Sequence, residues 1–148
     1  RDQPRSRGLG DVYKRQGNDW VFDSRLSYTY QKAQDFTDKS DKDTYGGQIS
    51  YIPWHSGSAI LNAGYKSWEL NYSFIYTGER YDVSANTPEN YRLPWYTSDF
   101  SLAKKFSWRK YDFKLTLEVN NIFNQQYEVV RSYPMPGTNF KFILNLTI

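Results

Sequence analysis

The sequence predicts an all-β protein, and more specifically about six strands of an antiparallel transmembrane β-barrel. Apolar and polar residues alternate with a period of two over six segments, and the connections between these segments are alternately long and short. Aromatic residues make up 19% of the 148 residues, which argues against a disordered chain. No apolar run approaches the roughly 18 residues of a membrane helix, so helical membrane proteins are excluded.

The predicted strands cover residues 20–34, 58–65, 68–77, 97–106, 111–120 and 140–148. The first places Trp20 and Phe22 on one face and Asp23 and Arg25 on the other. Pro53 and Gly57 interrupt the extended segment before the second strand, which is therefore expected to begin at residue 58. A tight turn at Lys66-Ser67 joins the second strand to the third, and residues 107–110 join the fourth to the fifth. Proline-containing loops at 79–95 and 121–139 separate the others.

The two faces of the predicted strands differ in charge. The apolar faces carry a single charged residue, Lys104, whereas the opposite faces carry Asp23, Arg25, Glu69, Asp99, Lys105, Asp112, Lys114, Glu118 and Lys141. Half of the apolar positions are aromatic, and a sandwich core about 10 Å thick requires smaller side chains, whereas lipid tails conform to bulky rings. Lipid-facing girdle residues are predicted near the strand ends: Trp20, Tyr30, Tyr65, Trp68, Tyr76 and Tyr111.

Loop lengths predict the orientation. Outer-membrane barrels place short turns in the periplasm and long loops outside, so the C-terminus is expected to be periplasmic. Six strands cannot close a transmembrane barrel, because about eight is the minimum and an open edge in lipid is costly. The chain is therefore predicted to be the C-terminal part of a larger barrel.

Residues 1–16 differ from the remainder. They account for the whole net charge of +3, show no periodicity and lack the apolar stretch of a signal peptide. We expect this leader to be non-native or disordered, with a native basic linker as the alternative, and residues 17–148 to form the barrel segment. The remaining chain is neutral, so no nucleic-acid partner is expected.

Catalytic and metal sites are not predicted. The chain has no cysteine and one histidine, His55, which excludes disulfides, cysteine catalysis and histidine-rich sites. Asp35, Asp38, Asp41 and Asp43 lack the EF-hand spacing and are expected to form a solvated loop. Asp112 and Glu118 lie roughly 20 Å apart on one strand, too far for an acid–base pair. No cofactor is expected, and the protein is predicted not to be an enzyme.

The segment LEVNNIFNQQYEVVRSYPMPGTNFKFILNLTI, residues 117–148, resembles the end of TonB-dependent outer-membrane receptors. Supporting resemblances are YIPWHSGSA at 51–59, YTGERYD at 76–82 and YRLPWYTSDFSL at 91–102. The resemblance implies the final six strands of a plugged barrel of about 22 strands in the Gram-negative outer membrane. The plug and its TonB-contacting box are not in this chain, and Ile148 stands where the family usually ends in an aromatic residue.

The resemblance, which is to the siderophore and cobalamin type, implies TonB-energised uptake of a scarce ligand such as an iron-siderophore, haem or cobalamin-like molecule. The expected partners are this small-molecule ligand, TonB through the plug, the barrel-assembly machinery, and outer-membrane lipid with lipopolysaccharide. Ligand-contacting aromatics are predicted in the outer loops at Tyr81, Tyr91, Trp95 and Tyr133, and a C-terminal assembly strand is predicted from Phe140, Phe142, Leu144, Leu146 and Ile148. The alternatives are a porin, a barrel phospholipase or protease, and a soluble carbohydrate-binding β-sandwich.

Overall fold

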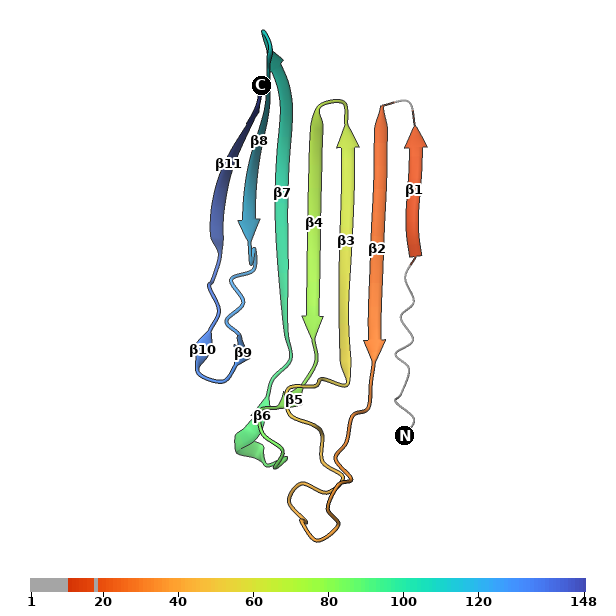
Figure 1. Cartoon of the computed structure of the whole chain (residues 1–148), viewed down its shortest axis with the longest axis vertical. Helices are drawn as coiled ribbons and strands as arrows, with labels where there is room; N and C mark the ends of the chain where they lie inside the picture. Colours follow the sequence, from red (N-terminus) through yellow and green to blue (C-terminus); the bar gives the residue numbers. More distant parts are fainter. Residues whose placement is uncertain (1–10, 18) are drawn as a thin grey trace.

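The computed structural model describes residues 11–17 and 19–148 and shows one antiparallel sheet with long connections at one end (Figure 1). Its seven strands lie in the order β1-β2-β3-β4-β7-β8-β11. They span Asp11–Gly17 (β1), Trp20–Tyr30 (β2), His55–Tyr65 (β3), Trp68–Thr77 (β4), Trp95–Trp108 (β7), Tyr111–Asn120 (β8) and Asn139–Thr147 (β11). The predicted all-β antiparallel fold is confirmed. Among the described residues, no helix has the length and hydrophobicity needed to cross a membrane.

The long connections contain two small ribbons and one short helix. Strands β5 (Arg80–Tyr81) and β6 (Tyr91–Arg92) pair with each other, as do β9 (Glu128–Val130) and β10 (Tyr133–Pro134). The 3-10 helix η1 (Pro88–Asn90) lies between β5 and β6.

All six predicted strands are present, but some of their bounds differ. Strand β3 begins at His55 rather than at residue 58, because Gly57 does not interrupt it but pairs with Tyr28 of β2. A Cβ atom at Gly57 would lie 3.2 Å from the Ser27 carbonyl oxygen, so glycine here allows close approach of the two strands. Strand β7 is longer than predicted, because its pairing with β4 begins at Trp95 and its pairing with β8 continues to Trp108.

Strand β1 was not among the predicted strands. Residues 11–17 pair with β2 from Asp11↔Leu26 to Gly17↔Trp20, within the segment that was expected to be a leader. The hydrogen bonds of such a pair join backbone groups, so a strand can pair in this way without alternating apolar and polar side chains. Residues 1–10 lie outside the described residues, and the non-native or disordered character of the leader stays a prediction.

The strand register brings the predicted apolar faces together on one side of the sheet. Directly paired residues share a face, and one such row joins Leu70 to Leu102, Leu117 and Phe142 across β4, β7, β8 and β11. On the opposite side, the row consists of Asp23, Asn62, Asn71, Ser101, Glu118 and Lys141. We call these two sides the apolar face and the polar face.

Within this chain the apolar face is not covered by a second layer. Among residues 19–148, the only buried hydrophobic residue is Ala103, whereas Phe140 is 75% exposed and Leu117 is 49% exposed. A water-soluble domain buries such a face against another layer of secondary structure. The sheet therefore presents a broad apolar surface to its surroundings.

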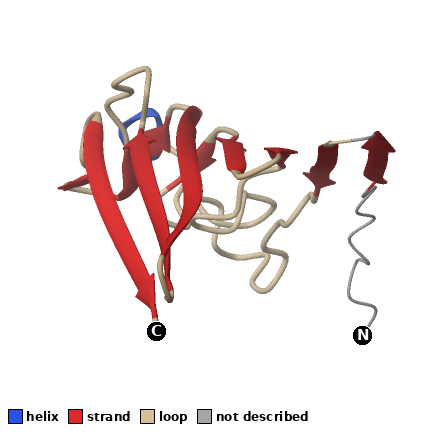
Figure 2. Ribbon diagram, turned by 90° about the horizontal axis from the view of Figure 1, so that it is seen from above, coloured by secondary structure: helices blue, strands red, loops and turns tan. Residues whose placement is uncertain are grey.

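The two ends of the sheet differ in the same way as the loop lengths predict. The short connections 66–67 and 109–110 lie at one end, the turn end, together with the C-terminus, and the three long connections lie at the other, the loop end (Figure 1). Lys66 and Arg109 take up the left-handed backbone of the short turns, with φ of 52° and 58°. The C-terminal strands are rotated relative to the N-terminal ones, as expected for a twisted sheet (Figure 2).

Candidate functional site: the polar face and the loop rim

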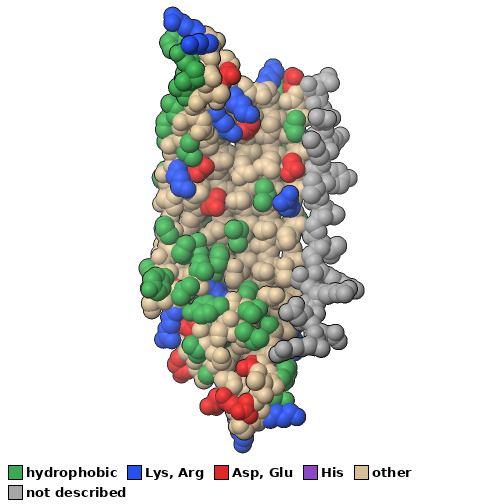
Figure 3. Space-filling model, in the orientation of Figure 1, with side chains coloured by type: hydrophobic (Ala, Val, Ile, Leu, Met, Phe, Trp, Pro, Cys, Tyr) green, Lys and Arg blue, Asp and Glu red, His purple; other side chains and the backbone are tan. Residues whose placement is uncertain are grey.

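The polar face is hollowed near the turn end. A concavity of about 700 Å³ is lined by side chains from β2, β3, β4, β7, β8 and β11, including Asp23, Asn71, Glu69, Lys114 and Glu118. Figure 3 shows acidic and basic side chains distributed over this part of the sheet, while hydrophobic side chains gather nearer the loop end. The sequence predicted charged residues on this face, and the register places them on one continuous wall.

Five of the charged residues on the polar face form ion pairs with one another. Glu69 accepts hydrogen bonds from Lys105 Nζ at 2.5 Å and from Lys114 Nζ at 2.6 Å, and Lys141 Nζ lies 3.8 Å from Glu118 Oε2. These side chains are partly exposed, so each pair contributes at most about 1 kcal/mol. Their arrangement suits a hydrated surface rather than a catalytic one. Asp112 and Glu118 lie on one strand but have different partners, since Asp112 accepts a hydrogen bond from Ser107 Oγ and Glu118 pairs with Lys141.

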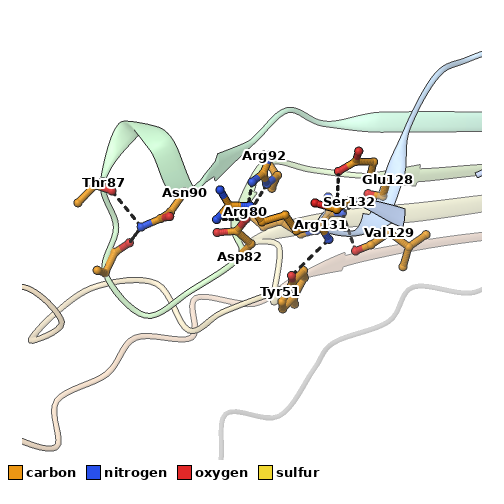
Figure 4. A network of polar contacts seen from close by, with 11 residues as sticks. Tyr51, Arg80, Asp82, Thr87, Asn90, Arg92, Glu128, Val129, Arg131 and Ser132 are labelled. Atoms are coloured by element: carbon orange, nitrogen blue, oxygen red, sulfur yellow. Dashed lines mark hydrogen bonds and ion pairs between the residues drawn. The ribbon is translucent and has the colours of Figure 1, made fainter. Parts of the chain in front are cut away.

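At the loop end, a buried carboxylate links two arginines. The Asp82 side chain is only 1% exposed, and its Oδ2 accepts hydrogen bonds from Arg92 Nε at 2.9 Å and Nη2 at 2.5 Å. Arg131 Nη1 lies 3.6 Å from the same oxygen (Figure 4). Asp82 and Arg92 belong to the connection between β4 and β7, whereas Arg131 belongs to the connection between β8 and β11. The carboxylate therefore joins two long loops.

Arg80 joins the same two loops in a second way. Its Nη2 donates hydrogen bonds to the carbonyl oxygens of Glu128 at 2.8 Å and Val129 at 3.2 Å (Figure 4). Burial lowers the pKa of the Arg80 guanidinium from its ordinary value, but an arginine stays protonated at neutral pH. Arg80 Nη1 and Asp82 Oδ1 are buried without a hydrogen-bond partner among the described residues. We call Arg80, Asp82, Arg92 and Arg131 the rim network.

The third long loop is attached to the rim network through Tyr51. Its backbone N–H donates to the Tyr81 carbonyl oxygen at 2.8 Å, and its hydroxyl oxygen accepts from the backbone N–H of Arg131 at 3.4 Å. The backbone N–H of Ser132 donates to Glu128 Oε2 at 3.0 Å (Figure 4). All three long loops are thus connected at one place.

Helix η1 ends within a set of side-chain hydrogen bonds. Asn90 Nδ2 donates to the Ala85 carbonyl oxygen at 3.0 Å and to Thr87 Oγ1 at 2.9 Å, and the backbone N–H of Asp82 donates to the Asn90 carbonyl oxygen at 3.0 Å. The tip of this loop therefore folds back onto Asp82, the residue that follows β5.

Three of the four predicted outer-loop aromatics lie around two neighbouring cavities. Tyr81 and Tyr91 meet edge to face at 5.7 Å between ring centroids and both line a cavity of about 250 Å³. Tyr91 and Trp95 line a second cavity of about 470 Å³. The fourth, Tyr133, is 71% exposed and lines neither cavity. A role in ligand contact stays a prediction for all four.

Two of these aromatics have partners that the sequence did not indicate. The Tyr91 hydroxyl donates to Glu79 Oε2 at 2.8 Å, and this hydrogen bond raises the pKa of Tyr91. Trp95 stacks on Tyr127 with 4.4 Å between ring centroids. Burial raises the pKa of Tyr127, with a further contribution from Asp99. Both tyrosines therefore remain neutral at physiological pH.

Sequence reasoning missed the rim network and Tyr127. Arg80 and Asp82 occur in the YTGERYD motif, yet a charged residue in a polar loop is normally solvated, and no periodic signal marks these two as buried. Their partners lie far away along the sequence, so only the folded sheet brings them together.

The residues considered for metal or catalytic roles have ordinary structural partners. The ring Nδ1 of His55 lies 2.7 Å from the Tyr28 hydroxyl. Asp35 accepts a hydrogen bond from the backbone N–H of Thr37, and Asp38 accepts one from that of Ser40. Hydrogen bonds from Thr37 lower the pKa of Asp35, and hydrogen bonds from Ser40 lower the pKa of Asp38. In the part of the chain that the structure describes, no group of histidine and acidic side chains could hold a metal ion.

Comparison with known families identifies the chain. The TonB dependent receptor-like, beta-barrel family matches residues 7–122, which include β1 to β8. The match begins inside the segment expected to be a leader and ends before most of the 117–148 stretch that carried the resemblance. No curated protein matches the sequence significantly. The extent of the family match, together with the antiparallel sheet and its two unlike faces, shows that the chain belongs to the β-barrel family of TonB-dependent receptors, which are outer-membrane transporters.

Proposed function

We propose that the chain is part of an outer-membrane receptor that takes up a scarce ligand with energy supplied through TonB. The ligand class is an iron-siderophore, haem or a cobalamin-like molecule, and no chemistry is performed on it. Family membership supports the transport assignment. The observation that carries the proposal further is the connection of all three long loops by the rim network, which builds a fixed polar and aromatic rim above a charged wall.

In this proposal the apolar face contacts lipid and the polar face lines the lumen. The charges of the polar face are then hydrated, and the exposed Leu117 and Phe142 are covered by acyl chains. The loop end faces outward, and the C-terminus lies in the periplasm. Strands β1 and β11 each have a single neighbour in the described sheet, so further strands are needed to satisfy their edges in a bilayer.

The rim offers ring faces and one guanidinium group to a ligand. Arg92, Tyr91 and Trp95 line the same cavity of about 470 Å³ at the loop end. Aromatic faces bind extended apolar or conjugated groups, and a guanidinium binds carboxylate groups. Haem carries groups of both kinds.

Uptake of labelled ligand tests the proposal. Cells that carry the full-length receptor are expected to accumulate a labelled ferric siderophore, haem or cobalamin only when TonB is present. The comparison uses matched strains with and without TonB and a receptor-free strain as background. Uptake that continues unchanged without TonB, and stops only for large solutes, would identify a porin and contradict the receptor assignment.

Deletion of residues 140–148 is expected to abolish insertion of the full-length protein into the outer membrane. This segment supplies most of β11, which pairs with β8 along its whole length, and it carries the apolar residues Phe140, Phe142, Leu144, Leu146 and Ile148. We propose that this strand is read by the barrel-assembly machinery and closes the edge of the sheet. Heat-modifiable migration of the membrane fraction measures insertion. A normally inserted, heat-modifiable barrel after the deletion would refute this role.

A further inference from the structure

A lysine lies on the apolar face near the turn end. Lys104 of β7 pairs directly with Trp68 of β4 and with Leu115 of β8, so its side chain belongs to the apolar face. It is the single charge among the apolar positions of the predicted strands. A lysine that faces lipid is costly at the bilayer midplane and close to neutral at the interface. Lys104 therefore marks the level of the headgroups at the turn end.

An apolar groove adjoins this lysine. It has a volume of about 370 Å³ and is lined by Trp20, Ala63, Tyr65, Trp68, Leu70 and Leu102. Ala63 pairs with Phe22 of β2 and with Leu70 of β4, and both of these side chains are larger. The small side chain of Ala63 therefore forms the floor of the groove. Strand β1 flanks the groove on one side and β8 on the other, so the groove is not a product of a sheet edge.

Aromatic rings and two cations form the end of the groove. Trp20 stacks on Tyr65 with 4.3 Å between centroids, Lys104 Nζ lies 4.3 Å from the centroid of the Trp68 ring, and Lys66 Nζ lies 5.1 Å from that of Tyr65. Within residues 19–148, no carboxylate lies within ion-pair distance of Lys104 or Lys66. The neighbouring Lys105, on the polar face, is instead paired with Glu69. The end of the groove therefore carries two positive charges that no carboxylate of residues 19–148 neutralises.

We propose that this groove binds an anionic phospholipid of the inner leaflet of the outer membrane. An acyl chain lies along Ala63, Leu70 and Leu102, and the lipid phosphate contacts Lys104, with Lys66 as the second cation. An apolar groove that ends in basic residues matches a molecule with an acyl chain and a negative headgroup. The groove lining offers no carboxylate to the ammonium group of a zwitterionic lipid, so phosphatidylglycerol is favoured over phosphatidylethanolamine. This site rests on the proposed orientation, in which the turn end is periplasmic.

Lipid titration followed by native mass spectrometry tests the site in the full-length receptor. Phosphatidylglycerol is expected to bind more tightly than phosphatidylethanolamine, and Lys104→Gln is expected to weaken phosphatidylglycerol binding about five-fold, which corresponds to about 1 kcal/mol for one cation near a membrane surface. Lys66→Gln is expected to have a smaller effect in the same direction. The matched control is Lys105→Gln, which removes the same charge from the next position on the opposite face and should leave the affinity unchanged.

Three results of the lipid titration would overturn the site. They are equal affinity for the two lipids, an unchanged affinity in Lys104→Gln, and an equal loss in Lys105→Gln. Glycerol phosphate, which lacks acyl chains, is expected not to compete, and effective competition would show that the cations bind soluble phosphate rather than lipid. Heat-modifiable migration confirms that each variant is folded. Because the titration measures binding without transport, its failure would leave the uptake result standing, and the reverse is also true.

Discussion

Leu117→Arg is expected to destabilise the intact barrel by about 2–4 kcal/mol, because the side chain lies on the apolar face, where lipid is the proposed surroundings. Leu117 is 49% exposed in this chain and pairs with Leu102 and Phe142, so the new guanidinium would replace a side chain in the middle of an apolar row. The free energy of unfolding is measured by denaturant titration of the full-length protein in lipid vesicles.

Glu118→Arg is the matched control for this substitution. It introduces the same side chain one residue further along β8, on the polar face, and removes only the partly exposed pair with Lys141. Its expected cost is below about 1 kcal/mol. If both arginines were tolerated equally, or if Glu118→Arg were the more destabilising, the proposed assignment of the faces would be wrong.

Asp82→Ala is expected to release the loop end of the sheet. The carboxylate is 1% exposed and holds Arg92 and Arg131, so its removal leaves partly buried guanidinium groups without their counter-charge. Removing one partner of a buried pair costs about 3–5 kcal/mol, and we expect about 3 kcal/mol here because Arg92 is 27% exposed. Hydrogen exchange should show faster exchange in residues 78–94 and 121–138, with little change in β3 and β8.

Glu79→Ala provides the comparison for Asp82→Ala. Glu79 belongs to the same loop but is exposed and accepts a single side-chain hydrogen bond, from Tyr91. Its removal is expected to cost below about 1 kcal/mol and to leave the exchange of residues 121–138 unchanged. Equal exchange in the two variants would show that the rim network does not hold the loops together.

The sheet was predictable because alternate residues of each predicted strand belong to two unlike faces, one apolar and one polar. The period of two in residues 68–77 and 111–120 fixed both the strands and their faces, and the register followed the same pattern. Strand β1 was missed because its residues, DVYKRQG, mix charged and apolar side chains without alternation. Gly57 was taken as an interruption because sequence alone does not show whether a glycine ends a strand or allows a close approach.

The rim could be predicted only in part. Aromatic residues in long loops indicated Tyr91 and Trp95, which do line a common cavity. The contacts that order the loops join residues distant along the chain, such as Arg80 and Glu128, and each of these residues is individually indistinguishable from a solvated charge. Local patterns carry no information on such pairs, because their burial depends on how three loops meet above the sheet.

The assignment of the two faces is tested most directly by fluorescence quenching along β8. These 148 residues contain no cysteine, so a single cysteine at each of positions 112–119 can carry a fluorophore in the full-length receptor reconstituted in lipid, once any cysteine elsewhere in that receptor has been replaced by serine. Quenching by brominated lipid is expected to alternate, strong at positions 113, 115, 117 and 119 and weak at 112, 114, 116 and 118. A pattern with the opposite phase, or equal quenching at all eight positions, would contradict the account of an apolar face in lipid and a polar face in the lumen.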